Sequence, residues 1–166
     1  MEHITFEPLG LDHEKEVMRI FNYYVENSFA AYPEKKLPDE FFERFLEMSE
    51  GYPAYAVKWQ GKIIGFCFLR AYHPFPVFRE TAEITYFIDK EHTGRGLGKV
   101  MLKKLEDEGK QRGISTIMAS ISSENMQSIA FHIKNGFTEC GRFPGVGKKF
   151  NIAFDMVWMV KKIAHS

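Results

Sequence analysis

The stretch TAEITYFI, residues 81–88, is followed closely by TGRGLG, residues 93–98. In the first stretch, side chains alternate in a pattern that predicts a β-strand with one buried face. The second stretch carries three alternating glycines and leads into apolar residues at helical spacing, namely Leu97, Val100, Met101 and Leu105. The two stretches therefore predict a strand, a glycine-rich turn and a helix whose first turn follows the glycines directly.

The rest of the chain adds strands and helices around this unit. We expect strands at Ile4–Glu7, Ala54–Trp59, Ile63–Ala71, Ser115–Ile121, Phe137–Gly141 and Phe150–Val160. We expect helices from about Asp12 to Glu26, from Pro38 to before Gly51, and over Asn125–Asn135. Because strands come first and then alternate with helices, the sequence predicts an α/β (α+β) fold with helices on the faces of a mixed sheet.

Composition limits the class of protein. The chain has 166 residues, of which 45% are hydrophobic, and a formal net charge of +0. The length suits one domain, the apolar content excludes a disordered chain, and the zero charge argues against binding nucleic acid or an anionic membrane through an overall positive field. Two cysteines, Cys67 and Cys140, are too few for a disulfide scaffold or a multi-thiolate zinc site, and we expect no metal. With neither a secretory pattern nor a membrane span visible, we expect a cytoplasmic protein.

The glycine-rich turn predicts an anion site. Glycine allows a positive φ and lets a ligand approach the backbone, so the free N–H groups of the helix's first turn converge on one point. Arg95 and Lys99 flank the turn and would add positive charge. The Walker A pattern fails because Val100 stands where Ser or Thr is needed, and the dinucleotide pattern fails because its third glycine would fall on Lys99 or Met101. The alternative is a turn that only connects the strand to the helix.

The motif Thr93-x-x-Gly96-x-Gly98, placed between a strand and a helix, resembles motif A of the GNAT superfamily of acyl-CoA N-acyltransferases. The similarity is closest to the phosphinothricin and L-amino-acid acetyltransferase branch. It extends to the segments Phe21-Asn22-x-Tyr24-Val25-x-x-Ser28, Thr81-Ala82-Glu83, Asn125-x-x-Ser128-x-x-x-His132-x-x-x-Gly136-Phe137 and Phe154-Asp155-Met156-Val157-Trp158. Thr93 stands where the family usually has Gln or Arg, which changes a side-chain contact but not the backbone cradle.

The resemblance implies a fold, a co-substrate and a reaction. It implies a single N-acetyltransferase domain over residues 1–166, with a mostly antiparallel sheet of about six to seven strands flanked by about four helices. It implies acetyl-CoA as co-substrate, a small primary amine as acceptor, and a homodimer. The implied acetyl-CoA contacts are the backbone of Tyr86, Phe87 and Ile88, the loop residues Gly94, Arg95, Gly96, Leu97, Gly98 and Lys99, and the side chains of Asn125 and Ser128.

Acetylation of an amine needs a base, because an alkyl ammonium carries an extra proton near pH 7. Glu83 lies in the predicted strand before the turn, where a partly desolvated carboxylate would accept that proton. The alternatives are a Glu on a solvent-exposed face or in a cross-strand ion pair. His132 lies on the same face of a predicted helix as Asn125 and Ser128. The alternative for His132 is a surface histidine, and the alternative for Asn125 is a helix cap or first-turn residue. By resemblance, Glu83 and His132 are catalytic, with His132 either a second base or the proton donor to the leaving thiolate.

The acceptor side is less well defined by the sequence. By resemblance, Tyr32, Phe78 and Arg79 contact the acceptor. The related branch has another Arg where Phe75 stands here, and Arg is the natural partner of a carboxylate. This difference leaves two readings, amino-acid recognition through Arg79 or a pocket for a more apolar amine. Core or interface packing is the alternative for the aromatic residues.

Three functions fit these residues. The first is an enzyme that transfers acetyl from acetyl-CoA to a small amine, such as an L-amino acid, phosphinothricin or methionine sulfoximine. We expect direct attack by the amine, because no activated Ser or Cys is apparent. The second is a non-catalytic acyl-CoA-binding module, and the third is a protein or peptide N-acetyltransferase. Candidate aromatic residues for a dimer contact are Phe41, Phe42, Phe75 and Phe78.

Overall fold

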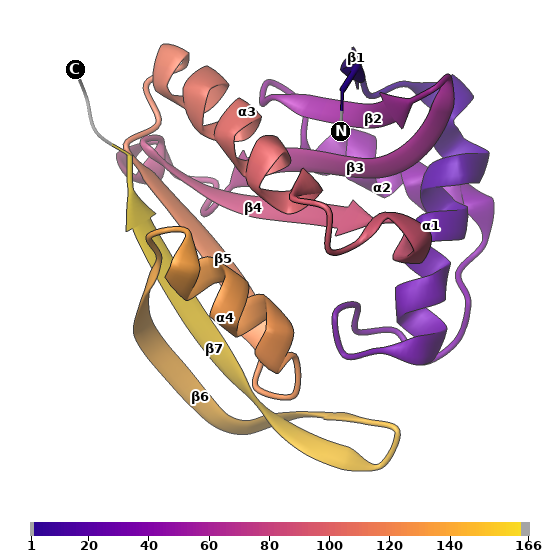
Figure 1. The fold of residues 1–166 in the computed structure, drawn as a ribbon. Helices are drawn as coiled ribbons and strands as arrows, with labels where there is room; N and C mark the ends of the chain where they lie inside the picture. The colour runs from indigo at the N-terminus through magenta and orange to yellow at the C-terminus, as the bar shows by residue number, and fades with distance from the viewer. Residues whose placement is uncertain (1, 164–166) are drawn as a thin grey trace.

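The computed structural model describes residues 2–163 (Figure 1). The strands in this range are β1 (Ile4–Pro8), β2 (Ala54–Trp59), β3 (Lys62–Ala71), β4 (Thr81–Ile88), β5 (Thr116–Ser122), β6 (Thr138–Lys149) and β7 (Ile152–Lys162). The α-helices in this range are α1 (Glu14–Asn27), α2 (Phe42–Met48), α3 (Leu97–Gln111) and α4 (Met126–Lys134). Short 3-10 turns lie at Leu11–His13, Asp39–Phe41, Pro76–Phe78 and Lys90–His92. These elements confirm the predicted α/β architecture.

The strands of this part of the chain form one sheet in the order β1-β2-β3-β4-β5-β7-β6. Each neighbouring pair is antiparallel except β4 and β5, which run parallel. Their pairing covers only Thr81–Glu83 against Thr116–Met118. Beyond these residues β4 and β5 diverge, as Figure 1 shows, and we call this region, residues 84–88 and 119–122, the β4–β5 fork.

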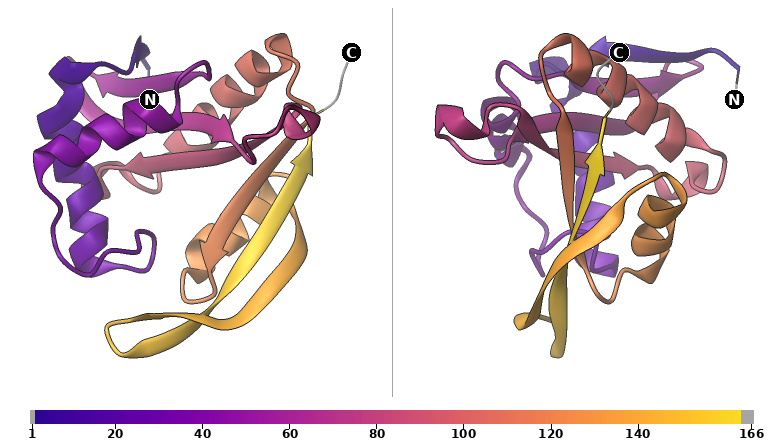
Figure 2. Two further views of the ribbon diagram at one scale, coloured as in Figure 1. Left: turned by 180° about the vertical axis from the view of Figure 1, so that it is seen from behind. Right: turned by 90° about the vertical axis from the view of Figure 1, so that its left-hand side faces the viewer.

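Different helices cover the two faces of the sheet. The aromatic side chains of Phe66 and Phe68 in β3 pack with α1 and α2, whereas Cys67 and Leu69 of the same strand pack with α3. This alternation places α1 and α2 on one face and α3 on the other. The helix α4 lies on the α3 side, over β5 and β7 (Figures 1 and 2). Among the described residues, no helix covers β5 and β7 on the α1 side, as the left view of Figure 2 shows.

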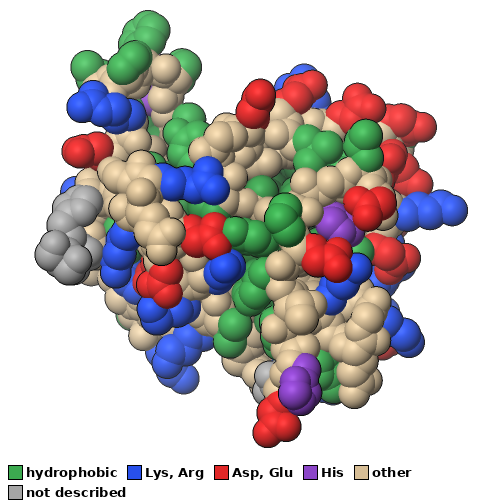
Figure 3. Space-filling view, turned by 90° about the horizontal axis from the view of Figure 1, so that it is seen from above, with side chains coloured by type: hydrophobic (Ala, Val, Ile, Leu, Met, Phe, Trp, Pro, Cys, Tyr) green, Lys and Arg blue, Asp and Glu red, His purple; other side chains and the backbone are tan. Residues whose placement is uncertain are grey.

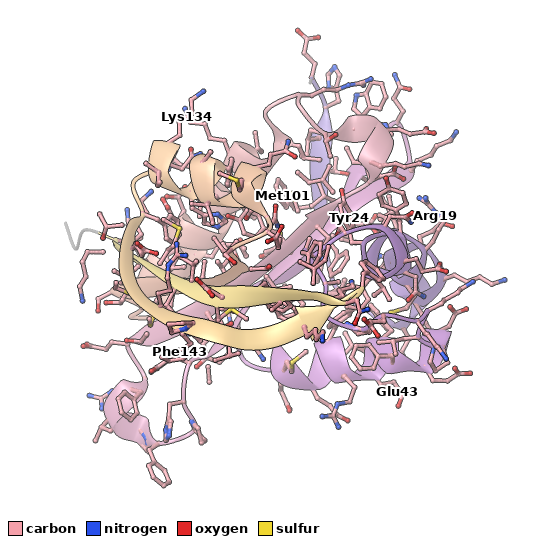
Figure 4. All side chains as sticks on the ribbon, turned by 90° about the horizontal axis from the view of Figure 1, so that it is seen from below. Arg19, Tyr24, Glu43, Met101, Lys134 and Phe143 are labelled. Carbon is pink, nitrogen blue, oxygen red and sulfur yellow. The ribbon has the colours of Figure 1, made fainter. Side chains whose placement is uncertain are left out.

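The outermost strand is longer than predicted. We expected a strand at Phe137–Gly141, but β6 runs from Thr138 to Lys149 and forms a long hairpin with β7. Pro144 and the neighbouring glycines break the strand pattern in the sequence. An edge strand tolerates such residues because one side of its backbone needs no partner, and the register with β7 is irregular there. Phe143, labelled in Figure 4, is exposed on this hairpin.

Two expectations about individual side chains have opposite outcomes. Cys67 lies in an apolar stretch of the sequence, residues 63–69, which predicts a buried side chain, and it is buried. Phe42, by contrast, was expected at the surface and is fully buried, and Phe41 stacks on Phe21 beside it. The helical spacing turns Phe42 toward the sheet, so neither Phe41 nor Phe42 is an exposed candidate for a dimer contact. No helix within residues 2–163 has both the length and the apolar character that crossing a membrane requires.

A buried lysine fastens the β6–β7 hairpin to the segment that follows α1. Lys149 is only 1% exposed. Its ammonium group donates to the carbonyl oxygens of Val25 at 2.7 Å, Ser28 at 2.6 Å and Ala31 at 2.5 Å. These three bonds use all three hydrogens of the ammonium group, and burial lowers the pKa of Lys149. The position of the next residue in that segment, Tyr32, therefore depends on Lys149.

Replacing Lys149 with Met should lower the free energy of unfolding by about 2–4 kcal/mol, because buried carbonyl oxygens lose their charged donor. Urea denaturation followed by circular dichroism measures this change. Lys148→Met is the matched control, since Lys148 is the exposed neighbour on the same strand. Equal stability of the two variants would contradict a stabilising role for the three hydrogen bonds of Lys149.

Candidate active site

The glycine-rich turn leaves open space at the N-terminus of α3. Gly94 and Gly96 have positive φ angles of 75° and 80°. A Cβ atom at either position would meet nothing within 4 Å. Gly96 is the N-cap residue of α3, and the N–H groups of the helix's first turn have no partner inside the helix. With Arg95 and Lys99 exposed beside them, these groups offer what a pyrophosphate needs.

The next two residues hold the turn against its neighbours. Leu97 is buried in the core beneath α3. A Cβ atom at Gly98 would lie 3.1 Å from the ring of Phe131 in α4, so glycine allows the two helices to approach closely. The side-chain oxygen of Asn125 accepts the N–H of Ser128 at 3.3 Å and caps α4. The structure therefore places Asn125 as a helix cap, which was one of the two readings of the sequence.

The edge of β4 in the β4–β5 fork is open to a ligand. On one side, residues 86–88 pair with β3, where Tyr86 lies opposite Cys67. On the other side, pairing with β5 has already ended at Glu83. The hydroxyl of Tyr24, labelled in Figure 4, donates to the carbonyl of Ile88 and fixes the end of β4 to α1. The free backbone edge, together with the nearby glycine turn, fits acetyl-CoA, which has an amide-bearing arm and a pyrophosphate.

Glu83 is held by one of its two carboxylate oxygens. Nη2 of Arg70 lies 3.0 Å from Oε1 of Glu83, and Oγ of Ser120 donates to the same oxygen at 3.0 Å. Oε2 accepts no hydrogen bond from the residues that the structure describes. Glu83 is 7% exposed, so the carboxylate is fixed and largely out of water. This arrangement leaves Oε2 available to take a proton from a ligand.

His132 is also buried, and both of its ring nitrogens are engaged. Nδ1 lies 2.7 Å from the carbonyl oxygen of Ser128, which can only accept, so Nδ1 carries the hydrogen. Nε2 then accepts the hydroxyl hydrogen of Tyr86, at 2.6 Å. Burial lowers the pKa of His132, although its bond to Ser128 opposes this effect. Burial also raises the pKa of Tyr86. His132 is therefore neutral and acts as a hydrogen-bond acceptor toward Tyr86.

The two predicted catalytic side chains lie on opposite faces of β4. Ala82 and Ile84 pack in the core beneath α3, so Glu83 between them faces the α1 side. Tyr86 and its partner His132 belong to the α3 and α4 side. No hydrogen bond joins Glu83 to His132 among the described residues. The two groups flank the β4–β5 fork from two sides.

Of the predicted acceptor contacts, Tyr32 lies beside Glu83. Its hydroxyl is 3.5 Å from the carbonyl oxygen of Ser120, whose side chain binds Glu83, and its ring stacks on Phe154. Phe78 lies farther out, in the loop between β3 and β4. There its ring contacts Tyr72.

Arg79 does not reach this group in the structure. It is exposed, and its guanidinium donates to the carbonyl of Pro76 in its own loop at 3.3 Å. Phe75 in the same loop is 65% exposed. The loop projects from the body of the protein, as the right view of Figure 2 shows, and apolar side chains gather on this projecting corner in Figure 3.

Three residues near Glu83 were not predicted as site residues, namely Arg70, Ser120 and Trp158. Arg70 lies opposite Glu83 in the register of β3 and β4, and Ser120 lies opposite Trp158 in the register of β5 and β7. The sequence carries one signal for Arg70, because it is a charged residue at the end of the otherwise apolar run of β3. The register that brings it to Glu83 depends on the long β3–β4 connection, which the sequence pattern does not determine.

Comparison with known proteins identifies the family. The sequence matches the acetyltransferase (GNAT) family over residues 17–137. Among its relatives, the L-methionine sulfoximine/L-methionine sulfone acetyltransferase of Salmonella typhimurium is 29% identical over 145 residues, which make up 86% of this chain and 85% of that protein. This relative agrees with the branch that the sequence motifs resemble.

Solved structures show the same fold. The ribosomal-protein-alanine N-acetyltransferase of Brucella melitensis is 28% identical with a TM-score of 0.87, covering 95% of this chain and 99% of that one. The yncA protein of Salmonella typhimurium, solved with its cofactor acetyl-CoA, is 26% identical with a TM-score of 0.87, covering 98% and 95%. Because the family match spans most of the chain, this protein belongs to the acetyltransferase (GNAT) family and is an acetyl-CoA-dependent N-acetyltransferase.

Proposed function

We propose that this enzyme acetylates the primary amine of a small amino acid or amino-acid analogue, with Glu83 as the general base. The observation that supports this proposal most strongly is the carboxylate of Glu83, which is bound through Oε1 and free at Oε2. It lies at the end of the β4–β5 pairing, where an acyl group in the fork would be within reach. Acetyl-CoA, when bound, supplies the acetyl group as a reactive thioester.

The residues on the two sides of the fork would have different roles in the reaction. On the α1 side, Oε2 of Glu83 accepts the proton that the amine loses as it attacks the acetyl carbonyl. Along β4, the free backbone edge at residues 86–88 offers N–H groups to the charge that develops on the carbonyl oxygen. On the α4 side, we assign the hydroxyl of Tyr86, which is held by His132, to the leaving sulfur. It gives the sulfur a proton as the C–S bond breaks, and solvent returns a proton to Tyr86 and removes the one on Glu83.

The cradle is proposed to hold the pyrophosphate of acetyl-CoA. Its predicted contacts are the turn residues Gly94, Arg95, Gly96, Leu97, Gly98 and Lys99, with Asn125 and Ser128 on α4 beside them. Exposed backbone at the two positive-φ glycines supports this placement, as does the free first turn of α3. Because backbone amides would make most of the contacts with the pyrophosphate, the zero net charge of the chain is compatible with a highly anionic ligand.

Two observations bear on the acceptor. The similar acetyltransferase of Salmonella typhimurium is named for methionine sulfoximine and methionine sulfone, which are amino acids with a free amine. In this chain, the hydroxyl of Tyr32 lies 3.5 Å from the carbonyl oxygen of Ser120, so an aromatic side chain borders the acceptor side. The likeness to a ribosomal-protein-alanine acetyltransferase makes a protein N-terminus the second candidate.

Glu83→Gln should lower kcat for amine acetylation by about 10²–10³ and leave acetyl-CoA affinity within about twofold of wild type, because only the proton acceptor is lost. Release of CoA thiol, measured with amino acids, simple amines and peptides, reports the rate, and calorimetry reports the affinity. Glu80→Gln is the matched control, since Glu80 is exposed just before β4. Undiminished turnover in Glu83→Gln would remove Glu83 as the base. No turnover in wild type with any acceptor would favour a non-catalytic acyl-CoA-binding module.

Gly96→Val should weaken acetyl-CoA binding by at least about tenfold, because valine disfavours a positive φ and places a side chain in the cradle. Gly61→Val is the matched control. Gly61 has a similar φ of 76° and open space around it, but it lies in the β2–β3 turn. Calorimetry on both variants separates strain from loss of the cradle. Equal acetyl-CoA affinity in the two variants would show that the phosphates bind elsewhere.

We also propose that the whole chain, residues 1–166, is one catalytic domain that works as a homodimer in the cytoplasm. Exposed apolar side chains support a contact between two copies, with Val77 of the projecting loop 81% exposed and Phe143 and Val146 of β6 53% and 60% exposed. Sedimentation velocity should show one species of twice the 19.3 kDa chain mass. A species of the chain mass alone at micromolar concentration would exclude the dimer.

A further inference from the structure

Two N–H groups near Glu83 are buried without a hydrogen-bond partner. They are Nε of Arg70 and Nε1 of Trp158. Most buried donors in proteins are paired, so an unpaired one usually signals a missing partner or a functional role. Both groups can only donate. A partner that satisfies them must therefore supply hydrogen-bond acceptors.

The residues that carry these donors lie on the same face of the sheet as Glu83. Arg70 is directly opposite Glu83 across β3 and β4, and directly opposed residues in an antiparallel pair share a face. Ser120 binds Glu83 and is directly opposite Trp158 across β5 and β7. Arg70, Glu83, Ser120 and Trp158 thus form a staggered row on one face of four neighbouring strands, since Ser120 lies two residues beyond Met118, the register partner of Glu83. We call these four residues the acceptor row.

Aromatic side chains border the acceptor row. The hydroxyl of Tyr32 lies 3.5 Å from the carbonyl oxygen of Ser120, and Tyr72 packs edge-on against Trp158 with ring centroids 6.3 Å apart. The guanidinium of Arg70 donates through Nη1 to the sulfur of Met48, and its Nη2 forms an ion pair with Glu83 at 3.0 Å. Of its three nitrogen atoms, Nε is the one that is buried without a partner. The row therefore combines a base, a fixed positive charge and two unused donors.

We propose that Arg70 and Trp158 bind the carboxylate of the acceptor while Glu83 receives the proton from its amine. This inference rests on the proposed function and adds the groups that select the substrate. An α-amino acid carries its amine and carboxylate on one carbon, so the two groups must bind side by side. Arg70 and Glu83 are side by side in the acceptor row. An amine without a carboxylate would leave both N–H groups unpaired.

This assignment replaces the one that the sequence suggested for the carboxylate. From the sequence, Arg79 is the candidate, because Phe75 stands where the related branch has another Arg. In the structure, Arg79 is bound to its own exposed loop, whereas Arg70 contacts the general base directly. A guanidinium is well suited to the task, since it carries a permanent charge and directional donors.

Arg70 also positions Glu83, and this second role must be separated from carboxylate binding. Loss of Arg70 would disturb the base and slow the reaction with every acceptor. Trp158 makes no hydrogen bond to Glu83, so Trp158→Phe removes only the Nε1–H donor and keeps an aromatic ring. A comparison of two acceptors that differ only in the carboxylate therefore separates recognition from catalysis.

The test uses L-methionine sulfone and its carboxamide as acceptors with the full-length enzyme. Wild type should prefer the carboxylate in kcat/KM by at least about tenfold, the size expected of one charge-assisted hydrogen bond. Trp158→Phe should reduce that preference about fivefold or more, because it raises KM for the carboxylate by more than it raises KM for the carboxamide. Arg70→Met should abolish the preference and also lower kcat for both acceptors. Trp59→Phe, a matched change on β2, should keep the preference of wild type.

Three outcomes have distinct meanings. Turnover of both acceptors with equal efficiency in wild type, or a preference that survives in both variants, would overturn the carboxylate site while the proposed function stands. Calorimetry gives a readout that needs no turnover, and L-methionine sulfone should bind wild type more tightly than its carboxamide. Such binding without acetyl transfer to any acceptor would support the carboxylate site and overturn the proposed function. Loss of binding selectivity in Trp158→Phe, with thermal unfolding unchanged, would support the site directly.

Discussion

The parallel pairing of β4 with β5 ends after three residue pairs, at Glu83 and Met118. A parallel neighbour continuing to the end of β4 would occupy the backbone edge that an acyl-CoA arm needs. Because the strands diverge, that edge stays free, and the last paired residue carries the candidate base. The same divergence allows α4 to pack beside the start of α3, where Gly98 meets Phe131. One short ladder therefore determines the positions of the cradle, the free edge and the carboxylate.

The two sides of the fork differ in their chemistry. On the α1 side, Glu83 is oriented by Arg70 and Ser120 through one oxygen, and the surrounding side chains provide positive charge and donors. On the α4 side, His132 and Tyr86 form a neutral, buried hydrogen-bonded pair. A buried charge must have partners, and Arg70 and Ser120 are the partners of Glu83. With its carboxylate held in this way, Glu83 is suited to take a proton from an amine. The opposite faces of β4 keep these two environments separate.

The sequence predicted the parts of the site that lie close together along the chain. The strand at residues 81–88, the glycine turn and the helix after it follow from local alternation, glycine spacing and helical periodicity. The row that joins Glu83 to Arg70, Ser120 and Trp158 was not predictable, because it depends on register across four strands. The length of β6 was missed for a related reason, since Pro144 and the neighbouring glycines hide an edge strand that needs only one partner. Local pattern specifies the elements, and tertiary pairing specifies which side chains meet.

Hydrogen–deuterium exchange with and without acetyl-CoA tests most directly whether the fork is the cofactor site. We predict slower exchange of the backbone amides at residues 84–88 of β4 and at residues 97–99, the first turn of α3. The last turn of α3, residues 108–111, lies at the opposite end of that helix from the glycine turn and should exchange at the same rate in both states. Binding of acetyl-CoA that leaves residues 84–88 and 97–99 unprotected would contradict the assignment of the fork and the glycine turn to the cofactor.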